Sequence, residues 1–338
     1  MPIGGFISGC AGPALTPAET AFFQKANPWG LILFKRNCET PDQIAALTAT
    51  FRAAVARRDA PVFIDQEGGR VQRLGPPSNF WRRYPACRRY GDLHARDPIA
   101  AFRTARNIGR LMAEDLTAIG ITADCVPVLD VPQPDSHDII GERAYGLTPD
   151  RVIMLARAHM AGFAQGGVLP VIKHIPGHGR ARADSHLALP VVEASKAELE
   201  AFDFPPFAAL ADAPMAMTAH VVYTAFDKHQ PATLSKKIIA TVIRKHIGFN
   251  GLLMTDDLSM KALSGSYAEK SKAALAAGCD MLLHCNGELA EMEEVAAAVG
   301  ALTGKALRRA RLALKWVRKP QSYDRKAALQ DWDAIMSA

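Results

Sequence analysis

The sequence of 338 residues predicts an α/β protein of one domain with the (β/α)8 TIM barrel fold. Three observations lead to this prediction: eight short apolar runs, helix-forming segments between them, and polar residues where the runs end. Strands of a parallel barrel are buried on both faces, so they read as near-continuous apolar runs rather than as alternating patterns. Strands that alternate with helices favour a parallel sheet, and eight such units favour a closed barrel over an open sheet.

The eight runs are rich in Val, Ile, Leu and Met and recur along most of the chain. They lie at residues 5–10, 30–34, 61–66, 123–131, 169–175, 214–220, 251–257 and 280–286. We expect each run to form one barrel strand, in this order.

Helix starts between the runs are marked by capping boxes, in which Ser or Thr precedes Glu or Gln by three residues. The predicted boxes are Thr16 with Glu19, Thr40 with Gln43, and Ser195 with Glu198. Helix ends are expected at glycines that precede a strand, namely Gly166, Gly167 and Gly278.

Residues 1–338 contain no internal repeat, low-complexity tract or linker, so one domain is the simplest account. Residues from about 290 to 338 are expected to form a helical C-terminal tail. Its basic segment, "KALRRARLALKWVRKP", is interpreted as a solvated helix face whose long side chains keep their charges in water.

Composition points to a soluble protein of the cell interior. The net charge of +6 is a modest excess that favours acidic partners only weakly. The first residues lack the features of a signal peptide, and no apolar run approaches the length of a membrane span. The six cysteines form no C-x-x-C pair and are expected to be reduced thiols. We therefore expect a monomeric cytoplasmic protein with no membrane partner.

Polar residues lie at the carboxyl ends of most of the apolar runs. They are Asp65, Asp130, Lys173, His174, His220, Asp256, Asp257, His284 and Asn286. In barrels of this kind the carboxyl ends of the strands carry the chemistry, so these side chains predict an active site at that rim.

Several classes of site are not supported by the sequence. His174 and His178 have the spacing of a helical zinc pair, but Pro176 and Gly177 between them break any helix, so we expect no metal. No phosphate-binding glycine loop is present, so we expect no nucleotide and no other cofactor. The segment "RRYPACRRY" (82–90) interleaves Arg with aromatics, yet no nucleic-acid recognition module accompanies it, and we interpret it as a basic loop.

The remaining rim residues suit cleavage of a glycosidic bond, which needs an acid for the leaving oxygen and, in retaining enzymes, a carboxylate nucleophile. "TDDLSM" (255–260) supplies a strand-end carboxylate. In "KHIPGHGRARADSH" (173–186), Asp184 and His186 are two residues apart, so a bend could join carboxylate and imidazole into an acid/base pair. A polar turn without chemistry is the alternative interpretation of the same residues.

Five motifs together resemble glycoside hydrolase family 3: "IDQEGGRVQRL" (64–74), "KHIPGHG" (173–179), "DSH" (184–186), "MTAHVVY" (217–223) and "MTDDLSM" (254–260). More narrowly, they are similar to the single-domain bacterial β-N-acetylglucosaminidases of cell-wall recycling. The resemblance implies that Asp256 is the nucleophile and that Asp184 and His186 form the general acid/base. It also implies a set of sugar-binding residues: Asp65, Arg143, Lys173 and His174.

Other rim residues are expected to act indirectly. We expect His178 to position the loop by a hydrogen bond, and His220 and Asp257 to orient their neighbours. Gly177 and Gly179 are interpreted as hinges of a mobile loop over residues 176–186. The sequence departs from the family at Ile175, where an aromatic is usual, and at Arg180, where Asp is common, and both departures concern specificity more than mechanism.

The resemblance implies a retaining exo-β-N-acetylglucosaminidase without cofactor. Its expected substrate is the N-acetylglucosaminyl–1,6-anhydro-N-acetylmuramic acid unit of recycled peptidoglycan, with or without peptide. A β-glucosidase or a glycoside phosphorylase of the same family is an alternative, and so is an inert sugar-binding barrel. The presence of both Asp256 and the Asp184–His186 pair argues against the inert barrel, because binding alone needs neither.

Overall fold

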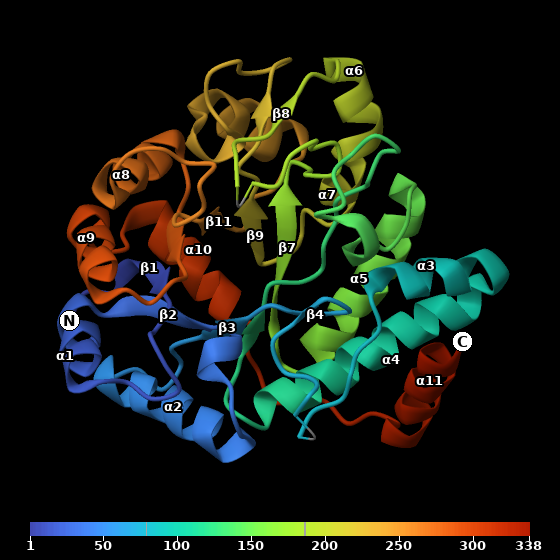
Figure 1. Ribbon diagram of the computed structural model, residues 1–338, viewed down its shortest axis with the longest axis horizontal. Coiled ribbons are helices and arrows are strands. Elements are labelled where there is room, and N and C mark those ends of the chain that lie inside the picture. The colour runs from blue at the N-terminus through green and yellow to red at the C-terminus, as the bar shows by residue number, and fades with distance from the viewer. Residues whose placement is uncertain (79, 186) are drawn as a thin grey trace.

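The computed structural model describes residues 1–78, 80–185 and 187–338, and within them eight parallel strands form a closed barrel (Figure 1). The strands follow one another around the barrel in chain order: β1 (Gly4–Ser8), β2 (Pro28–Leu33), β3 (Val62–Ile64), β6 (Ala123–Asp124), β7 (Leu169–Ile175), β9 (Met215–Thr218), β11 (Leu252–Asp257) and β12 (Met281–His284). Parallel pairing of β12 with β1 closes the ring. Each predicted run overlaps one of these strands, so the predicted fold class is confirmed.

Helices cover the outside of the barrel (Figure 1). They are α1 (Pro17–Ala26), α2 (Pro41–Ala54), α3 (Cys87–Arg96), α4 (Pro98–Thr117), α5 (Pro149–Gln165), α6 (Lys196–Glu198), the π-helical η3 (Leu199–Asp203), α7 (Pro205–Ala209), the π-helical η5 (Ile238–His246), α8 (Tyr267–Ala277), α9 (Leu289–Val299), α10 (Gly304–Leu314) and α11 (Arg325–Ser337). Short turns of 3₁₀ geometry are η1 (Lys35–Asn37), η2 (Gly141–Arg143) and η4 (Ala232–Leu234). None of the described helices is long and apolar enough to cross a membrane.

Two of the three predicted capping boxes are confirmed, those of Thr16 with Glu19 and of Ser195 with Glu198. The third is only half formed. The Thr40 hydroxyl accepts from the backbone N–H of Gln43 as expected, but Oε1 of the Gln43 side chain accepts from the backbone N–H of Glu39 at 2.9 Å instead of from that of Thr40. Gly278 ends α8 in the left-handed conformation, as predicted.

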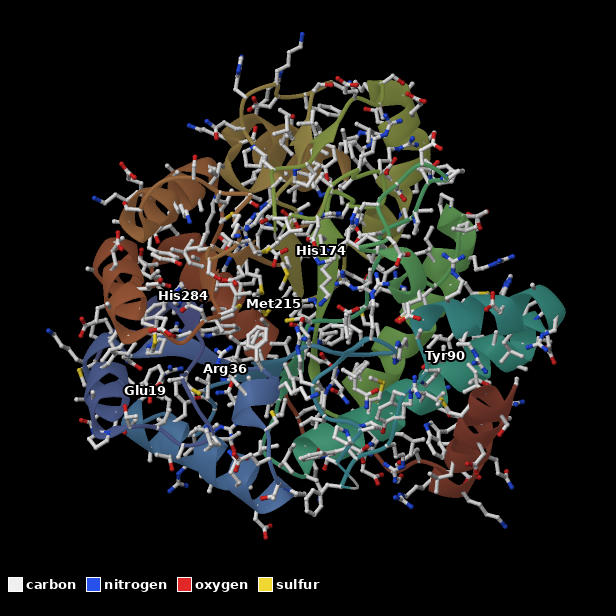
Figure 2. All side chains as sticks on the ribbon, in the orientation of Figure 1. Glu19, Arg36, Tyr90, His174, Met215 and His284 are labelled. Atoms are coloured by element: carbon white, nitrogen blue, oxygen red, sulfur yellow. The ribbon has the colours of Figure 1, made fainter. Side chains whose placement is uncertain are left out.

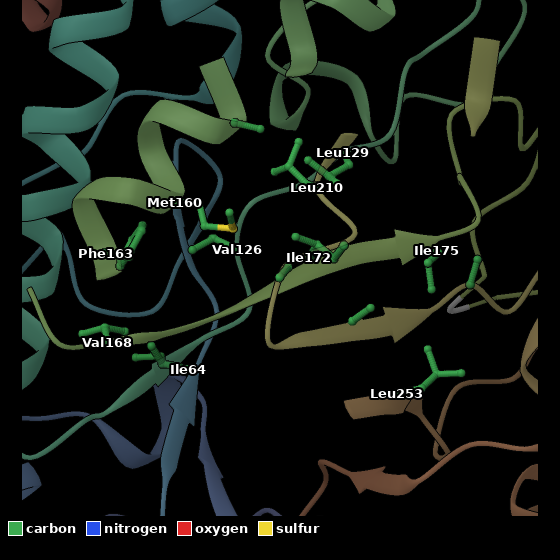
Figure 3. Packing of buried hydrophobic residues seen from close by; sticks show 14 of the residues in the cluster. Ile64, Val126, Leu129, Met160, Phe163, Val168, Ile172, Ile175, Leu210 and Leu253 are labelled. Carbon is green, nitrogen blue, oxygen red and sulfur yellow. The ribbon is translucent and has the colours of Figure 1, made fainter. Parts of the chain in front are cut away.

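The barrel interior is filled by side chains from all eight strands, among them Met215, which Figure 2 labels at the centre of the barrel. A second, larger cluster lies between the strands and the helices. Figure 3 shows part of it, where Ile172 of β7 packs near Met160 of α5. This two-sided burial is the reason that the strands read as continuous apolar runs.

Helix α10 packs against the barrel-interior cluster through Ala310 and Ala313, together with Leu302 just before it. Arg309 of the same helix pairs with Asp280 at 2.9 Å. The interpretation of this basic segment as a solvated face was therefore wrong in part, because one side of the helix joins the core. Within α10 the two buried residues are alanines, which give only a weak apolar signal in the sequence.

Additional strands were not predicted. β4 (Gln66–Gly68) pairs antiparallel with β5 (Val71–Gln72), and β8 (Val191–Val192) pairs in parallel with β10 (Val222–Tyr223). The predicted run at 123–131 forms regular strand only over β6, and Pro127 further along has no N–H to donate to a neighbouring strand. The chain continues beside β7, where Leu129 donates to the carbonyl of Lys173 at 2.7 Å. This contact carries Asp130 to the rim.

Candidate active site

A cavity of about 290 Å³ opens where the strands end. Seven of the predicted site residues line it: Asp65, Arg143, Lys173, His174, His178, Asp256 and Asp257. His220 is fully buried behind this surface. Ser185 also lines the cavity, whereas Asp184 is not among the described residues that do so. The predicted acid/base residue His186 lies outside the described residues.

Lys173, at the end of β7, is the centre of a buried charge network. Its ammonium lies 2.8 Å from Asp65 and 2.7 Å from Glu67. Glu67 in turn accepts two hydrogen bonds from Arg143, at 2.8 and 2.9 Å. Asp65 also pairs with Arg73 at 3.0 Å. The network therefore joins residues from β4, β7, η2 and the chain around β5 into one rigid wall of the cavity.

The network fixes the ionisation of its members. Burial alone would raise the pKa of Glu67, but the nearby cations of Arg143 and Lys173 outweigh burial and lower it to about 2. The pKa of Asp65 is lowered for the same reason, by Lys173 and Arg73. Burial disfavours the charged form of Lys173, yet Asp65 and Glu67 raise its pKa above the ordinary value. Both carboxylates and the ammonium are thus charged at neutral pH.

Glu67 and Arg73 join the site although neither was predicted from the sequence, and both lie within the motif at residues 64–74. Glu67 precedes two glycines with positive φ, Gly68 and Gly69, and the close approach of Gly68 to the carbonyl of Pro85 leaves no room for a side chain. The glycine pair that follows Glu67 was the signal in the sequence that could have identified Glu67 as a site residue. It marks a tight turn, which returns Glu67 toward the cavity.

His174 is held by Asp130, which is fully buried at the end of the strand-like segment after β6. The ring Nδ1 lies 2.7 Å from one carboxylate oxygen of Asp130. The other oxygen accepts the backbone N–H groups of His174 and His178, at 3.2 and 2.6 Å. Because a carboxylate lies at Nδ1, that nitrogen is the donor to Asp130. Nε2 of His174 is then the nitrogen available to a ligand. Asp130 was recognised in the sequence only as a strand-end residue.

His178 connects the two ends of the loop that carries Asp184. Its Nε2 lies 3.3 Å from the hydroxyl of Ser185. Burial, reinforced by His174, lowers the pKa of His178 to about 4, so the ring is neutral at pH 7. Ser185 is further held by the N–H of Ala262, which donates to its carbonyl at 3.2 Å. Asp184 therefore directly precedes an anchored residue.

Gly177 and Gly179, the two predicted hinges, lie in closely packed surroundings. A Cβ on Gly179 would lie 2.1 Å from the carbonyl oxygen of Val131, and Gly177 has φ of +137° and packs against Asp203. The hydroxyl of Tyr223 donates to the carbonyl of Gly177 at 2.6 Å. These glycines permit close packing of residues 176–181, of which Ala181 is buried, and the mobility of the loop stays a prediction.

The end of β11 holds two adjacent carboxylates in different surroundings. Asp257 accepts from the N–H groups of Ser259 and Cys285, at 3.0 and 3.1 Å, and from the hydroxyl of Ser259. Asp256 accepts from the N–H of Asp257 at 2.8 Å and lines the cavity. The carboxylate of Asp257 is thus engaged in closing the turn after the strand.

His220 supports the same strand end from behind. Its Nδ1 lies 2.7 Å from the hydroxyl of Thr233, and its Nε2 lies 3.0 Å from the carbonyl oxygen of Asp257. Burial lowers the pKa of His220, so its ring is neutral and donates from Nε2 to this carbonyl. The contact holds the carbonyl of Asp257, the residue directly after Asp256.

Among the described residues, no group of three or more His, Cys, Asp or Glu side chains is arranged to hold a metal ion. In the basic segment at residues 82–90, Tyr84 and Tyr90 are buried, and Arg82 and Tyr84 both contact Asp115 of α4 at 2.6 Å. These tyrosines belong to the core and do not form a surface on which bases could stack.

Comparisons with known proteins identify the family. Residues 16–316 match the model of the glycosyl hydrolase family 3 N terminal domain. A beta-hexosaminidase of Chromobacterium violaceum is 40% identical over 306 residues, which cover 89% of this chain and 83% of the relative. The crystal structure of native NagZ from Neisseria gonorrhoeae is 32% identical, with a TM-score of 0.85, and the match covers 100% of this chain and 97% of NagZ. The same figures describe NagZ from this bacterium in complex with N-trifluoroacetyl-D-glucosamine. The family predicted from the motifs is confirmed, and the chain belongs to glycosyl hydrolase family 3.

Proposed function

We propose that the chain is a retaining exo-β-N-acetylglucosaminidase that acts through a covalent glycosyl-aspartate intermediate. The observation that carries the proposal is the position of Asp256, a strand-end carboxylate that lines the same small cavity as the charge network of Lys173. Membership of family 3 supports the hydrolase class, and the relatives named beta-hexosaminidase support the coarser activity on N-acetylhexosamines. Binding sites for small molecules span about 300–1,000 Å³, so a cavity near the lower limit suits one terminal sugar ring.

Asp256 is the proposed nucleophile, and Asp257 is not. The three hydrogen bonds accepted by Asp257 occupy its carboxylate and would resist its attack on a sugar. Asp256 lines the cavity, and the hydrogen bond from the N–H of Asp257 limits the rotation of its carboxylate. A carboxylate held in this way can capture an oxocarbenium-like centre and later release it to water.

The proposed sugar site is the wall built by Asp65, Glu67, Arg143, Lys173 and His174. Asp65 stays ionised and can accept from sugar hydroxyls. The ammonium of Lys173 has three donors, of which Asp65 and Glu67 take two, so the third can donate to a sugar hydroxyl or to the N-acetyl carbonyl. Because these groups are preorganised by one another, they can hold the ring without rearrangement.

The acid/base is proposed to be His186 assisted by Asp184. The support from the described residues is the anchoring of Ser185 between them: its hydroxyl meets His178, and its carbonyl accepts from the N–H of Ala262. The carbonyl of Asp184 also closes a turn by accepting from the N–H groups of Leu187 and Ala188. Because Ser185 lines the cavity, these contacts favour an acid/base on this segment.

The proposal is tested by turnover of para-nitrophenyl β-N-acetylglucosaminide beside the matching glucoside. We expect a strong preference for the N-acetyl sugar, because a site built to hydrogen-bond a polar group rejects the analogue that lacks it. Equal kcat/KM values on the two substrates would contradict the hexosaminidase assignment. Release of a sugar 1-phosphate when inorganic phosphate is added would identify a phosphorylase instead.

We propose further that the natural substrate is the N-acetylglucosaminyl–1,6-anhydro-N-acetylmuramic acid unit of peptidoglycan, with or without peptide, cleaved by a monomer in the cytoplasm. The resemblance of the motifs to recycling enzymes supports this finer assignment. Purified anhydro-muropeptides should release N-acetylglucosamine, measured by mass spectrometry. Full activity on the chromogenic substrate with no release from muropeptides would refute the substrate and leave the activity standing.

A further inference from the structure

The base of the loop that carries Asp184 is tied to a neighbouring helix by an ion pair, although the sequence has Arg at a position where the family commonly has Asp. The Nε of Arg180 lies 2.7 Å from the carboxylate of Asp203, the last residue of η3. The guanidinium also lies 5.7 Å from the ring centroid of Phe202. Only 1% of the Asp203 side chain is exposed, against 18% for Arg180.

This pair completes a set of contacts that hold residues 176–181, which we call the loop base. Tyr223 holds the carbonyl of Gly177, and Asp130 accepts from the N–H of His178. The carbonyls of Gly179 and Ala181 accept from the N–H groups of Gln133 and His137, at 3.2 and 2.8 Å. The Arg180 pair adds a charged tie to η3, so the loop base is held by several separate parts of the fold.

The loop base determines where Asp184 can lie. Ala181 is the last residue of the base, and Ser185 is anchored by His178 and Ala262, so residues 182–184 span the distance between the two anchors. Because this span is short, a change in the direction of the base at Arg180 is transmitted to Asp184.

Stability alone does not explain the pair. One oxygen of the Asp203 carboxylate is buried without a hydrogen-bond partner among the described residues. Burying an incompletely bonded charge costs free energy, and buried ion pairs are weak contributors to stability. The Arg180–Asp203 ion pair is better explained as a contact that specifies one arrangement of the loop base than as a source of stability.

We infer that Arg180 and Asp203 are positioning residues that hold the loop base so that the acid/base segment meets the glycosidic oxygen. The inference rests on the proposed function, because it presupposes an acid on this loop. Neither side chain lines the cavity in the described part of the chain, so both act through the loop and not on the sugar.

The titration of Asp203 offers an independent readout. Burial raises the pKa of Asp203 to about 6, Arg180 opposes this rise, and Asp130 and Glu198 add to it. Tyr223 also faces Asp203, and its pKa is raised well above the ordinary value by burial, so it stays neutral. Above about pH 6 the carboxylate is ionised and binds Arg180; below this pH it is protonated and the ion pair is lost.

The experiment measures glycosylation rates on two aryl N-acetylglucosaminides, one with a dinitrophenyl leaving group and one with a poor phenol. A poor leaving group needs protonation, and a good one does not. A misplacement of about 1 Å can cost about 100-fold, so Arg180→Gln and Asp203→Asn should each lose about 10- to 100-fold on the poor leaving group and little on dinitrophenyl. The double variant should lose no more than either single variant, because the two residues act as a unit.

Three further variants make the result decisive. Arg180→Lys keeps the charge and should restore part of the rate, whereas Arg182→Gln, at an exposed arginine two residues further along the loop, should match the unmodified chain. In the unmodified chain, the glycosylation rate on the poor leaving group should fall relative to the rate on the dinitrophenyl substrate as the pH drops below about 6. This fall should be absent in Asp203→Asn. His186→Ala must show the same dependence on the leaving group.

The outcomes separate the two proposals. If His186→Ala is insensitive to the leaving group, the proposed acid/base fails and this inference fails with it. If His186→Ala is sensitive but Arg180→Gln and Asp203→Asn slow both substrates equally, the pair has only a structural role and the inference alone is overturned. Because Asp203→Asn preserves the shape of the side chain, it remains informative even if Arg180→Gln unfolds.

Discussion

Replacement of Glu67 by Gln tests the charge network most directly, because Glu67 touches both Arg143 and Lys173 and is almost fully buried. The amide keeps the shape of the side chain but removes the charge. Arg143 then loses its two charge-assisted hydrogen bonds, and Lys173 keeps only Asp65 as a counter-ion. We expect a less stable protein with a weaker sugar site.

The size of the effect can be worked out in two independent ways. The pKa of Glu67 falls from 4.5 to about 2. Each pKa unit corresponds to about 1.4 kcal/mol, so the ionised form contributes on the order of 3 kcal/mol to folding. Removal of one partner of a buried ion pair costs about 3–5 kcal/mol in other proteins. On both grounds we expect a loss of about 3 kcal/mol at pH 7.

The sign of the pH dependence is also determined. The pKa of Glu67 is lowered on folding, so its contribution is complete above the unfolded value of 4.5 and is lost as the pH falls toward 2. The difference in unfolding free energy between the unmodified chain and Glu67→Gln should therefore be constant from pH 7 down to about pH 5. It should then shrink steadily at lower pH.

The assay is urea unfolding followed by far-ultraviolet circular dichroism, with KM measured on the chromogenic N-acetylglucosaminide. The matched control is Glu193→Gln, at an exposed glutamate whose replacement should change stability by no more than about 0.5 kcal/mol. If Glu67→Gln is as stable as this control at pH 7 and its KM is unaltered, the network does not have the importance that we assign to it.

The remaining predictions concern the reacting groups. Asp256→Ala should lower kcat by about four orders of magnitude with an unchanged urea midpoint. A fluorinated sugar should label Asp256 in the unmodified chain, as read by mass spectrometry. A label on Asp257 would show that the wrong carboxylate was chosen. His186→Ala should slow glycosylation far more for a natural disaccharide than for a dinitrophenyl substrate. Asp184→Ala should show the same pattern more mildly, with the basic limb of the pH profile at lower pH, since a carboxylate favours imidazolium. Equal slowing of both substrates would mean that the acid lies elsewhere on the rim.

The barrel and the position of its active rim follow from local features of the chain. The eight apolar runs are continuous because each strand is covered on both faces, and this requirement is visible in every run separately. Polar residues that end a strand must meet at one edge of a parallel sheet, so the strand-end positions of Asp65, Lys173 and Asp256 suffice to predict that they share a site. Capping boxes are equally local, since Thr16 and Glu19 lie within one helical turn.

Which groups share a hydrogen bond depends instead on how the folded chain packs. Glu67 and Arg143 are 76 residues apart, and Asp130 and His174 are 44 apart, so nothing in the local pattern of either residue indicates its partner. The same holds for Arg180 with Asp203, and for Gly179, which has the sequence context of a hinge but packs against the carbonyl of Val131. Periodicity and capping act through neighbours along the chain, whereas charge pairing and close packing depend on distances that exist only after the barrel has closed.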